Sequence, residues 1–221
     1  MLFSKYMKIE FVPGIDYDSN IYVIDGKKPT IIDCGTGINH NRTIEKIKTY
    51  IDLKKISQII LTHEHFDHTG GIRKIKEEIG KNVKIISHKL AAEKIESGKS
   101  NFARMLGTEM KSIPVDIKIE NEQKMIIGDE NWDIYYTPGH SPGCISLYEK
   151  NSKSLISGDT IFSQGYFGRY DLPGGDPHLL KKSINRLSKL DIENLYPGHE
   201  NIVEKNAEEH IKKTLQNIRY I

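Results

Sequence analysis

The chain has 221 residues, of which 37% are hydrophobic and 28% are charged, as in an ordinary globular protein with a well-filled core. Its 32 Lys and Arg nearly balance its 30 Asp and Glu, and the net charge of +2 argues against a dedicated nucleic-acid binder, which would show a basic excess. Only Cys34 and Cys144 are available, which argues against a disulfide framework and favours a reducing compartment.

The N-terminal segment, Met1 to Glu10, carries three charges and lacks the apolar centre of a signal peptide. No apolar run approaches the roughly 20 residues that are needed to span a bilayer. The sequence therefore predicts a cytoplasmic protein that does not engage a membrane.

The first half of the chain is predicted to alternate short strands with helices. Strands are expected at Lys8–Val12, Asn20–Ile24, Thr30–Asp33, Ile56–Leu61 and Lys84–Ser87, and helices near Arg42–Ile51 and after Gly70-Gly71. The second helix is indicated by Ile72, Ile75 and Ile79, which recur at helical spacing. Residues 88–113 are expected to be helical or irregular.

The second half is predicted to be richer in strands, which begin at Ile117. They are expected at Lys124–Ile127, Trp132–Thr137, Ile145–Tyr148, Ser154–Ser157 and Asn194–Tyr196. Asp176-Pro177 is expected to open a helix with a capping carboxylate, and a closing helix is expected from Ala207. The buried stripe of the first of these helices is expected to comprise Leu179, Leu180, Ile184, Leu187 and Leu190. No repeat or linker divides residues 1–221, so we expect one α/β domain of layered sheets and helices.

Five of the nine histidines stand in turn segments that are rich in Gly, Pro and Asp. They are His63, His65 and His68 in THEHFDHTGG, His140 in TPGHSPG and His199 in YPGHE. Turns at the ends of rigid elements commonly carry ligand and catalytic residues. The other four histidines, at positions 40, 88, 178 and 210, lie outside these motifs and are interpreted as ordinary.

The HEHFDH segment is the most specific signal in the chain. His63 and His65 lie two apart at the end of a predicted strand, so both side chains would face one side and bind one metal ion. Asp67 and His68 would project beside them and add a carboxylate and an imidazole, a set suited to zinc, iron or manganese. Four potential ligands within six residues exceed what one tetrahedral ion takes from one loop, which predicts two ions.

Three more residues are expected to face the same cleft. His140 and His199 each follow a Pro-Gly pair at the end of a predicted strand. Asp159 follows a strand and a Gly that permits a sharp turn, and its two oxygens could bridge two ions. Taken singly, each has an ordinary interpretation as a surface or turn residue, and the HEHFDH segment favours the metal-ligand interpretation.

The motifs IIDCGTG, THEHFDH, TPGHSPG, SGDT and PGHE occur in this order between about Asn20 and His199. With these motifs the chain resembles the metallo-β-lactamase fold superfamily and, within it, the glyoxalase II-like hydrolases. The resemblance implies a four-layer αββα sandwich with the site at one edge of the two sheets. It also implies that His63, His65 and His140 hold one metal, that Asp67, His68 and His199 hold the other, and that Asp159 bridges them.

Such a site predicts hydrolysis of a small ester or thioester. Two ions roughly 3.5–4 Å apart lower the pKa of a shared water from 15.7 to near 7 and give a hydroxide that attacks a carbonyl. Asp67 is expected to orient this nucleophile while it binds metal. Asp33 is expected to hold a ligand histidine from outside the metal shell, and the resemblance implies that Arg169 or Tyr170 contacts substrate. Zinc is the expected metal, with iron or manganese as alternatives.

Other functions stay open from the sequence. Only about 22 residues follow His199, whereas glyoxalase II proper resembles a longer chain with basic contacts to glutathione, so glutathione specificity is not fixed. The main alternative is a mononuclear iron persulfide dioxygenase of the same fold. An RNA nuclease would need an RNA-docking surface, which the charge balance does not supply, and a non-catalytic metal protein is disfavoured because no ligand position is missing. A small-molecule substrate is expected, and a homodimer is left open.

Overall fold

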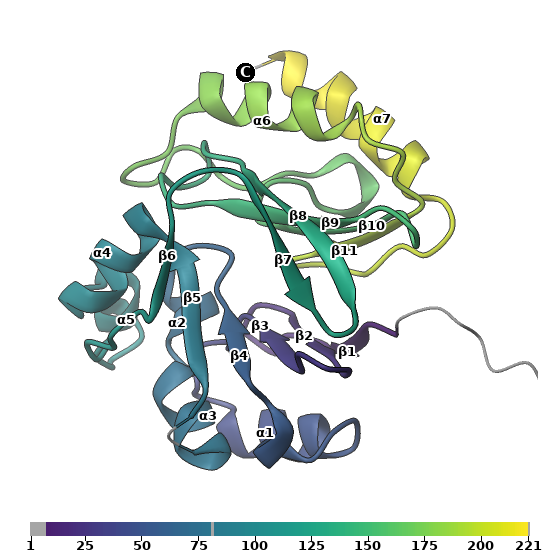
Figure 1. Ribbon diagram of the computed structural model, residues 1–221. Helices are drawn as coiled ribbons and strands as arrows, with labels where there is room; N and C mark the ends of the chain where they lie inside the picture. The colour runs from purple at the N-terminus through teal and green to yellow at the C-terminus, as the bar shows by residue number, and fades with distance from the viewer. Residues whose placement is uncertain (1–7, 81, 221) are drawn as a thin grey trace, which may run out of the picture.

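Two β-sheets lie face to face in the computed structural model, which describes residues 8–80 and 82–220 (Figure 1). Within these ranges the six-stranded sheet has the order β1-β2-β3-β4-β5-β6, with strands Glu10–Val12, Ile21–Ile24, Thr30–Ile32, Gln58–Ile60, Lys84–His88 and Ile117–Ile119. The five-stranded sheet of the same ranges has the order β11-β10-β9-β8-β7. Its strands, from β7 to β11, are Gln123–Ile127, Glu130–Tyr136, Ile145–Glu149, Ser154–Gly158 and Asn194–Pro197.

Helices cover the outer face of each sheet (Figure 1). The six-stranded sheet packs against α1 (His40–Lys48), α3 (Ile72–Ile79) and α4 (Lys89–Ser97), with the short α2 (Phe66–Thr69) and α5 (Asn101–Met105) beside them. The five-stranded sheet packs against α6 (Pro177–Leu187) and α7 (Ala207–Asn217). Turns of 3₁₀ helix occur at Leu53–Lys55, Ser163–Gly165 and Ile218–Tyr220. The predicted four-layer αββα sandwich is confirmed.

Alternation along the strands explains the layers. Successive strand residues point to opposite faces of a sheet. In β4, Ile59 packs into the apolar cluster beneath α1 and α3, whereas Ile60 packs into the central cluster between the sheets. Trp132 of β8 enters the same central cluster from the other sheet and is fully buried. β4 is therefore apolar on both faces, as are β2 and β3, which is why these segments read as apolar runs.

Parallel pairing sets where functional side chains can gather. The strands β3, β4, β5 and β6 pair in parallel, and so do β10 and β11. The carboxyl ends of parallel strands lie at one edge of a sheet. Asp33 follows β3, His63 follows β4 after two residues, Asp159 follows β10 and His199 follows β11 after one residue. The site described below lies where these edges of the two sheets meet.

Two expectations need correction or completion. Leu179 was expected in the buried stripe of α6, but it is 41% exposed, because the buried face follows the spacing of Leu180, Ile184 and Leu187 and Leu179 projects beside it. Leu190 lies beyond the end of α6 and packs half-buried against the same apolar cluster. Residues 88–113, which the sequence left unplaced, contain α4 and α5, and the ring of His88 caps α4 by accepting from the Leu90 N–H at 3.3 Å.

None of the helices that the structure describes is both long and apolar enough to cross a membrane. The prediction about a signal peptide concerns Met1 to Glu10, and residues 1–7 of that segment lie outside the described ranges.

Candidate metal centre

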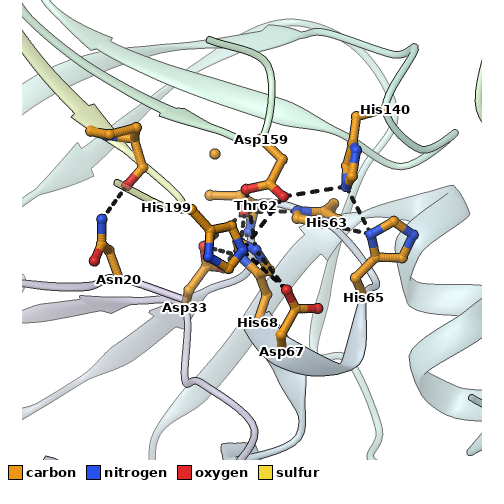
Figure 2. Close-up of polar contacts among 12 residues, drawn as sticks. Asn20, Asp33, Thr62, His63, His65, Asp67, His68, His140, Asp159 and His199 are labelled. Atoms are coloured by element: carbon orange, nitrogen blue, oxygen red, sulfur yellow. Dashed lines mark hydrogen bonds and ion pairs between the residues drawn. The ribbon is translucent and has the colours of Figure 1, made fainter. Parts of the chain in front are cut away.

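Seven side chains singled out from the sequence converge between the two sheets (Figure 2). Four of these side chains come from the segment that runs from the end of β4 into α2, on the six-stranded sheet. The other three come from the loops that follow β8, β10 and β11 of the five-stranded sheet. The seven are His63, His65, Asp67 and His68 from the first sheet, and His140, Asp159 and His199 from the second. The structure thus brings together every residue predicted to bind metal.

The first group consists of His63, His65 and His140. Nδ1 of His65 lies 3.1 Å from Nε2 of His63 and 2.8 Å from Nε2 of His140. One ring nitrogen of each residue lies within 4.8 Å of the others, with His63 fully buried and His140 4% exposed. Three imidazole nitrogens facing one point form a typical three-histidine metal face.

The second group consists of Asp67, His68 and His199. Oδ2 of Asp67 lies 3.1 Å from Nε2 of His199 and 3.8 Å from Nε2 of His68. Asp159 lies between the two groups, since its Oδ1 is 3.2 Å from Nε2 of His68 and its Oδ2 is 3.3 Å from Nε2 of His140. Oδ2 also lies 3.7 Å from Nε2 of His199, so this one carboxylate faces both groups.

Two atoms at the junction of the groups test whether a cation fits. Nε2 of His68 and Oδ1 of Asp159 are both buried and make no hydrogen bond to any described residue. An unsatisfied buried polar group costs about 1–3 kcal/mol, so such atoms call for a partner. A divalent cation is a partner for both, because it accepts an imidazole lone pair and a carboxylate oxygen together. The donor set of this cluster therefore fits a divalent metal site.

Asp33 fixes the orientation of His68. Its Oδ2 accepts from Nδ1 of His68 and from the hydroxyl of Thr62, both at 2.8 Å, and its Oδ1 accepts from the Thr62 N–H at 2.8 Å. Asp33 is 2% exposed and has a left-handed backbone with φ of 62°, which turns its carboxylate back toward the end of β4. Because Nδ1 of His68 donates its proton to Asp33, the lone pair of Nε2 points into the cluster.

Two other rings are oriented in the same way. Nδ1 of His63 lies 3.1 Å from the Thr62 hydroxyl, which already donates to Asp33 and so accepts from the ring. Nδ1 of His140 donates to the carbonyl oxygen of Arg169 at 2.6 Å. The Nε2 atoms of His63 and His140 therefore point toward the other side chains of the first group.

The electrostatics differ between the two groups. Burial lowers the pKa of His63 well below its usual value, helped by His68, and burial also lowers the pKa of His65 and of His140. Burial would lower the pKa of His68 as well, but the carboxylates of Asp159 and Asp33 outweigh it and raise that pKa well above its ordinary value. The pKa shifts therefore run downward for the three histidines of the first group and upward for His68 of the second.

The two residues expected to contact substrate have other contacts. The guanidinium of Arg169 donates to both oxygens of Asp171, at 2.9 and 2.8 Å, and its side chain is 67% exposed. Its contribution to the cluster is its backbone carbonyl, which holds His140. Tyr170 packs, partly buried, against the apolar cluster of α6 and α7. Substrate binding by these two residues stays a prediction.

Sequence reasoning passed over three polar residues around the cluster. Thr62 bonds to Asp33 and His63 as described. Glu64 is partly buried, which raises its pKa, and its Oε2 accepts from the Ser141 hydroxyl at 2.9 Å, which ties the first loop to the His140 loop. Asn20 holds the turn that carries His199. Thr62 and Glu64 belong to the THEHFDH motif, which was a signal to examine them, whereas nothing near Asn20 marked it.

Comparison with known proteins assigns the chain to a family. Residues 14–199 match the family model of the metallo-beta-lactamase superfamily. The chain is 38% identical to a probable metallo-hydrolase of Methanocaldococcus jannaschii over 203 residues, covering 88% of this chain and 93% of that protein. It is 31% identical to the hydroxyacylglutathione hydrolase GloC of Haemophilus influenzae over 188 residues, covering 80% and 82%.

Solved structures agree with this assignment. The crystal structure of the B3 metallo-beta-lactamase BLEG-1 matches with a TM-score of 0.78 at 27% identity, covering 96% of this chain and 99% of that one. The protein TTHA1623, crystallised in a di-iron-bound form, matches with a TM-score of 0.73 at 27% identity, covering 94% and 96%. The fold, the clustered histidines and aspartates and these matches together show that the chain belongs to the metallo-beta-lactamase superfamily of metallo-hydrolases.

Proposed function

We propose that this protein is a hydrolase that binds two divalent metal ions and cleaves a small ester or thioester. The observation that carries the proposal is the position of Asp159 between two sets of three ligand side chains. A single tetrahedral ion would need only four of these seven side chains. In the proposal the first group holds one ion, the second group holds the other, and Asp159 contacts both.

In this proposal a metal-activated water, and no side chain of the protein, is the nucleophile. Bound divalent ions supply a Lewis acid and a water of lowered pKa. Asp67 has a side chain that is 14% exposed, against 6% for Asp159, so it is the more accessible of the two carboxylates and the one that we propose orients the attacking water. Cys34 and Cys144 are buried, and burial raises the pKa of both thiols, so neither serves as a nucleophile.

The thioester class is supported by similarity. GloC of Haemophilus influenzae is a hydroxyacylglutathione hydrolase, and the chain matches it over most of both lengths. A hydroxyacyl thioester is an electrophilic carbonyl compound that water activated at such a centre would cleave. We therefore propose thioesters first and simple esters second as the substrate class.

A specific observation favours one other candidate. His63, His68 and Asp159 form a buried set of two histidines and one carboxylate with their ligand atoms within 4.8 Å of one another. This set is typical of non-haem iron oxygenases, and the similar TTHA1623 protein binds iron, although as a pair of ions. A mononuclear iron persulfide dioxygenase is therefore the second candidate.

One experiment separates the two. The purified protein is analysed for metal content by element and is then assayed with hydroxyacylglutathione thioesters, with small esters, and with glutathione persulfide in an oxygen electrode. We expect two divalent ions per chain, thioester or ester hydrolysis, and loss of metal together with turnover in Asp159→Ala. One iron per chain with oxygen uptake would refute the hydrolase proposal.

A further inference from the structure

We propose that Asn20 is a positioning residue for His199 and thereby sets the metal affinity of the second group. This inference rests on the proposed two-metal site. Asn20 lies at the entrance to β2, in the other sheet from His199 and 177 positions before Pro197. It is not among the side chains predicted to bind metal.

The side chain of Asn20 donates to two carbonyls of the His199 turn, one before and one after His199. Figure 2 shows Asn20 beside this turn. Its Nδ2 donates to the carbonyl of Pro197 at 3.0 Å and to the carbonyl of Glu200 at 2.8 Å. Its Oδ1 accepts from the Gly14 N–H at 3.0 Å, and its backbone N–H donates to the Gly198 carbonyl at 2.7 Å. Asn20 is 4% exposed, so these bonds are shielded from competing water.

His199 depends on its turn more than the other histidines do. Its side chain is 31% exposed, whereas that of His68 in the same group is fully buried. No residue that the structure describes hydrogen-bonds to Nδ1 of His199, although oxygen acceptors fix that atom in His63, His68 and His140. Apart from the contacts of Nε2 with Asp67 and Asp159 and the packing of the ring against His68 and Phe162, the position of His199 is therefore set by its backbone.

The backbone of the turn that carries His199 does not adopt its conformation by intrinsic preference. Glu200 has φ of 68°, in the left-handed region, which costs a residue with a side chain about 1–2 kcal/mol. A turn with such a residue keeps its shape only when its surroundings hold it. The two bonds from Nδ2 of Asn20, on either side of His199, supply that support.

The same segment reaches the other ligands of the second group. The N–H of Ser19, next to Asn20, donates to the carbonyl of Asp67 at 3.1 Å. The N–H of Gly198 donates to the carbonyl of Gly158 at 2.8 Å, and a side chain at Gly198 would collide with Asp159. Loosening the turn would thus move His199 relative to both neighbouring carboxylates.

The test is a metal titration of full-length variants. Metal-free wild type, Asn20→Ala and Asn20→Asp are titrated with Zn²⁺ against a chromophoric chelator, and their thermal unfolding is recorded. We call binding of the ion held by the first group the first step and binding of the ion held by the second group the second step. We expect Asn20→Ala to weaken the second step about 10- to 100-fold, the usual effect of losing an outer contact, and to leave the first step within about twofold. Asn20→Asp should weaken it at least as much, because a carboxylate would face two carbonyl oxygens.

A matched control lies at the other end of β11. Asn194 donates from Nδ2 to the Ser152 carbonyl at 2.8 Å and accepts from the Lys205 N–H at 3.0 Å, away from the cluster. Asn194→Ala should lose comparable stability with both binding steps unchanged. Tyr22→Phe, which removes only the hydroxyl bond to Pro197 at 2.6 Å, should weaken the second step in the same direction by less than tenfold.

The outcomes separate this inference from the proposed function. A wild type that binds two ions and an Asn20→Ala variant with an unchanged second step would overturn the role of Asn20 alone. Equal weakening in Asn194→Ala would do the same, because the effect would then reflect general destabilisation. A wild type that binds fewer than two ions would overturn the two-metal site and this inference with it.

Discussion

Replacement of Asp33 by Asn tests how the protein prepares His68 for metal. The substitution keeps the shape of the side chain and tolerates the left-handed backbone at this position, since Asn adopts φ near 60° readily. In Asp33→Asn, Oδ1 can still accept from the Thr62 N–H. At the other position an amide N–H₂ now faces Nδ1 of His68, where Oδ2 stood at 2.8 Å.

Two donors cannot share one hydrogen bond, so the His68 ring must move its proton from Nδ1 to Nε2. Nε2 is the atom that lies 3.2 Å from Asp159, so an incoming ion would have to displace that proton. We expect the second metal to bind about 10- to 100-fold more weakly, or about 1.4 to 2.8 kcal/mol. Asp33→Ala, which strands three buried donors, should also unfold more easily by about 3–5 kcal/mol.

The assay is calorimetric titration of the metal-free protein with Zn²⁺, with unfolding monitored in parallel. Asp116→Asn is the control, because Asp116 also accepts a backbone N–H, from Ile85 at 2.9 Å, but lies outside the cluster. We expect both binding steps of the control to match wild type. If Asp33→Asn also binds both ions with wild-type affinity, the tautomer argument fails.

Three further outcomes are expected. Glu64→Ala should weaken the first binding step about tenfold, because the His140 loop loses its anchor, whereas Glu64→Gln keeps an acceptor and should stay near wild type in the same titration. Burial lowers the pKa of His68 and of His199, but Asp159 and neighbouring carboxylates outweigh it and raise both, so these rings hold their protons to higher pH. The second ion should therefore bind progressively more weakly as pH falls from about 8 to 6, with the first step less affected, and equal slopes in titrations across that range would contradict this. Removing metal with a chelator should lower Tm by about 8 to 16 °C. This range follows from about 4 kcal/mol of stabilisation at a metal concentration of 1,000 times Kd and from a change in Tm of about 2 to 4 °C per kcal/mol. Calorimetric scans that coincide with and without metal would show that no ion stabilises the fold.

Local patterns predicted most of the elements. The helix expected from Ile72, Ile75 and Ile79 is α3, and all three side chains are buried. Such spacing reports directly on which face of a helix meets the core. The exposure of Leu179 shows the limit of that reasoning, since an apolar residue beside the stripe is indistinguishable in sequence from one within it.

The site was predictable to the extent that its parts are close in sequence. The HEHFDH segment places four of the clustered side chains within six residues, and its meaning did not depend on knowing the fold. The partners that hold them were not predictable in this way. Asn20 meets its partner 177 positions away, and His140 is held by a backbone carbonyl 29 positions away, an atom that every residue has.

The origin of the clustered side chains in two sheets has a consequence for how the protein matures. Each group of three combines side chains from the six-stranded sheet with one from the five-stranded sheet, so neither sheet carries a finished group. A polypeptide emerging from the ribosome therefore lacks the third side chain of the first group until His140 has been made, and that of the second group until His199, after β11, has been made. Unlike a zinc finger, in which the ion drives collapse, this chain is expected to dock its two sheets through the apolar cluster around Trp132 before an ion can meet all the side chains of either group.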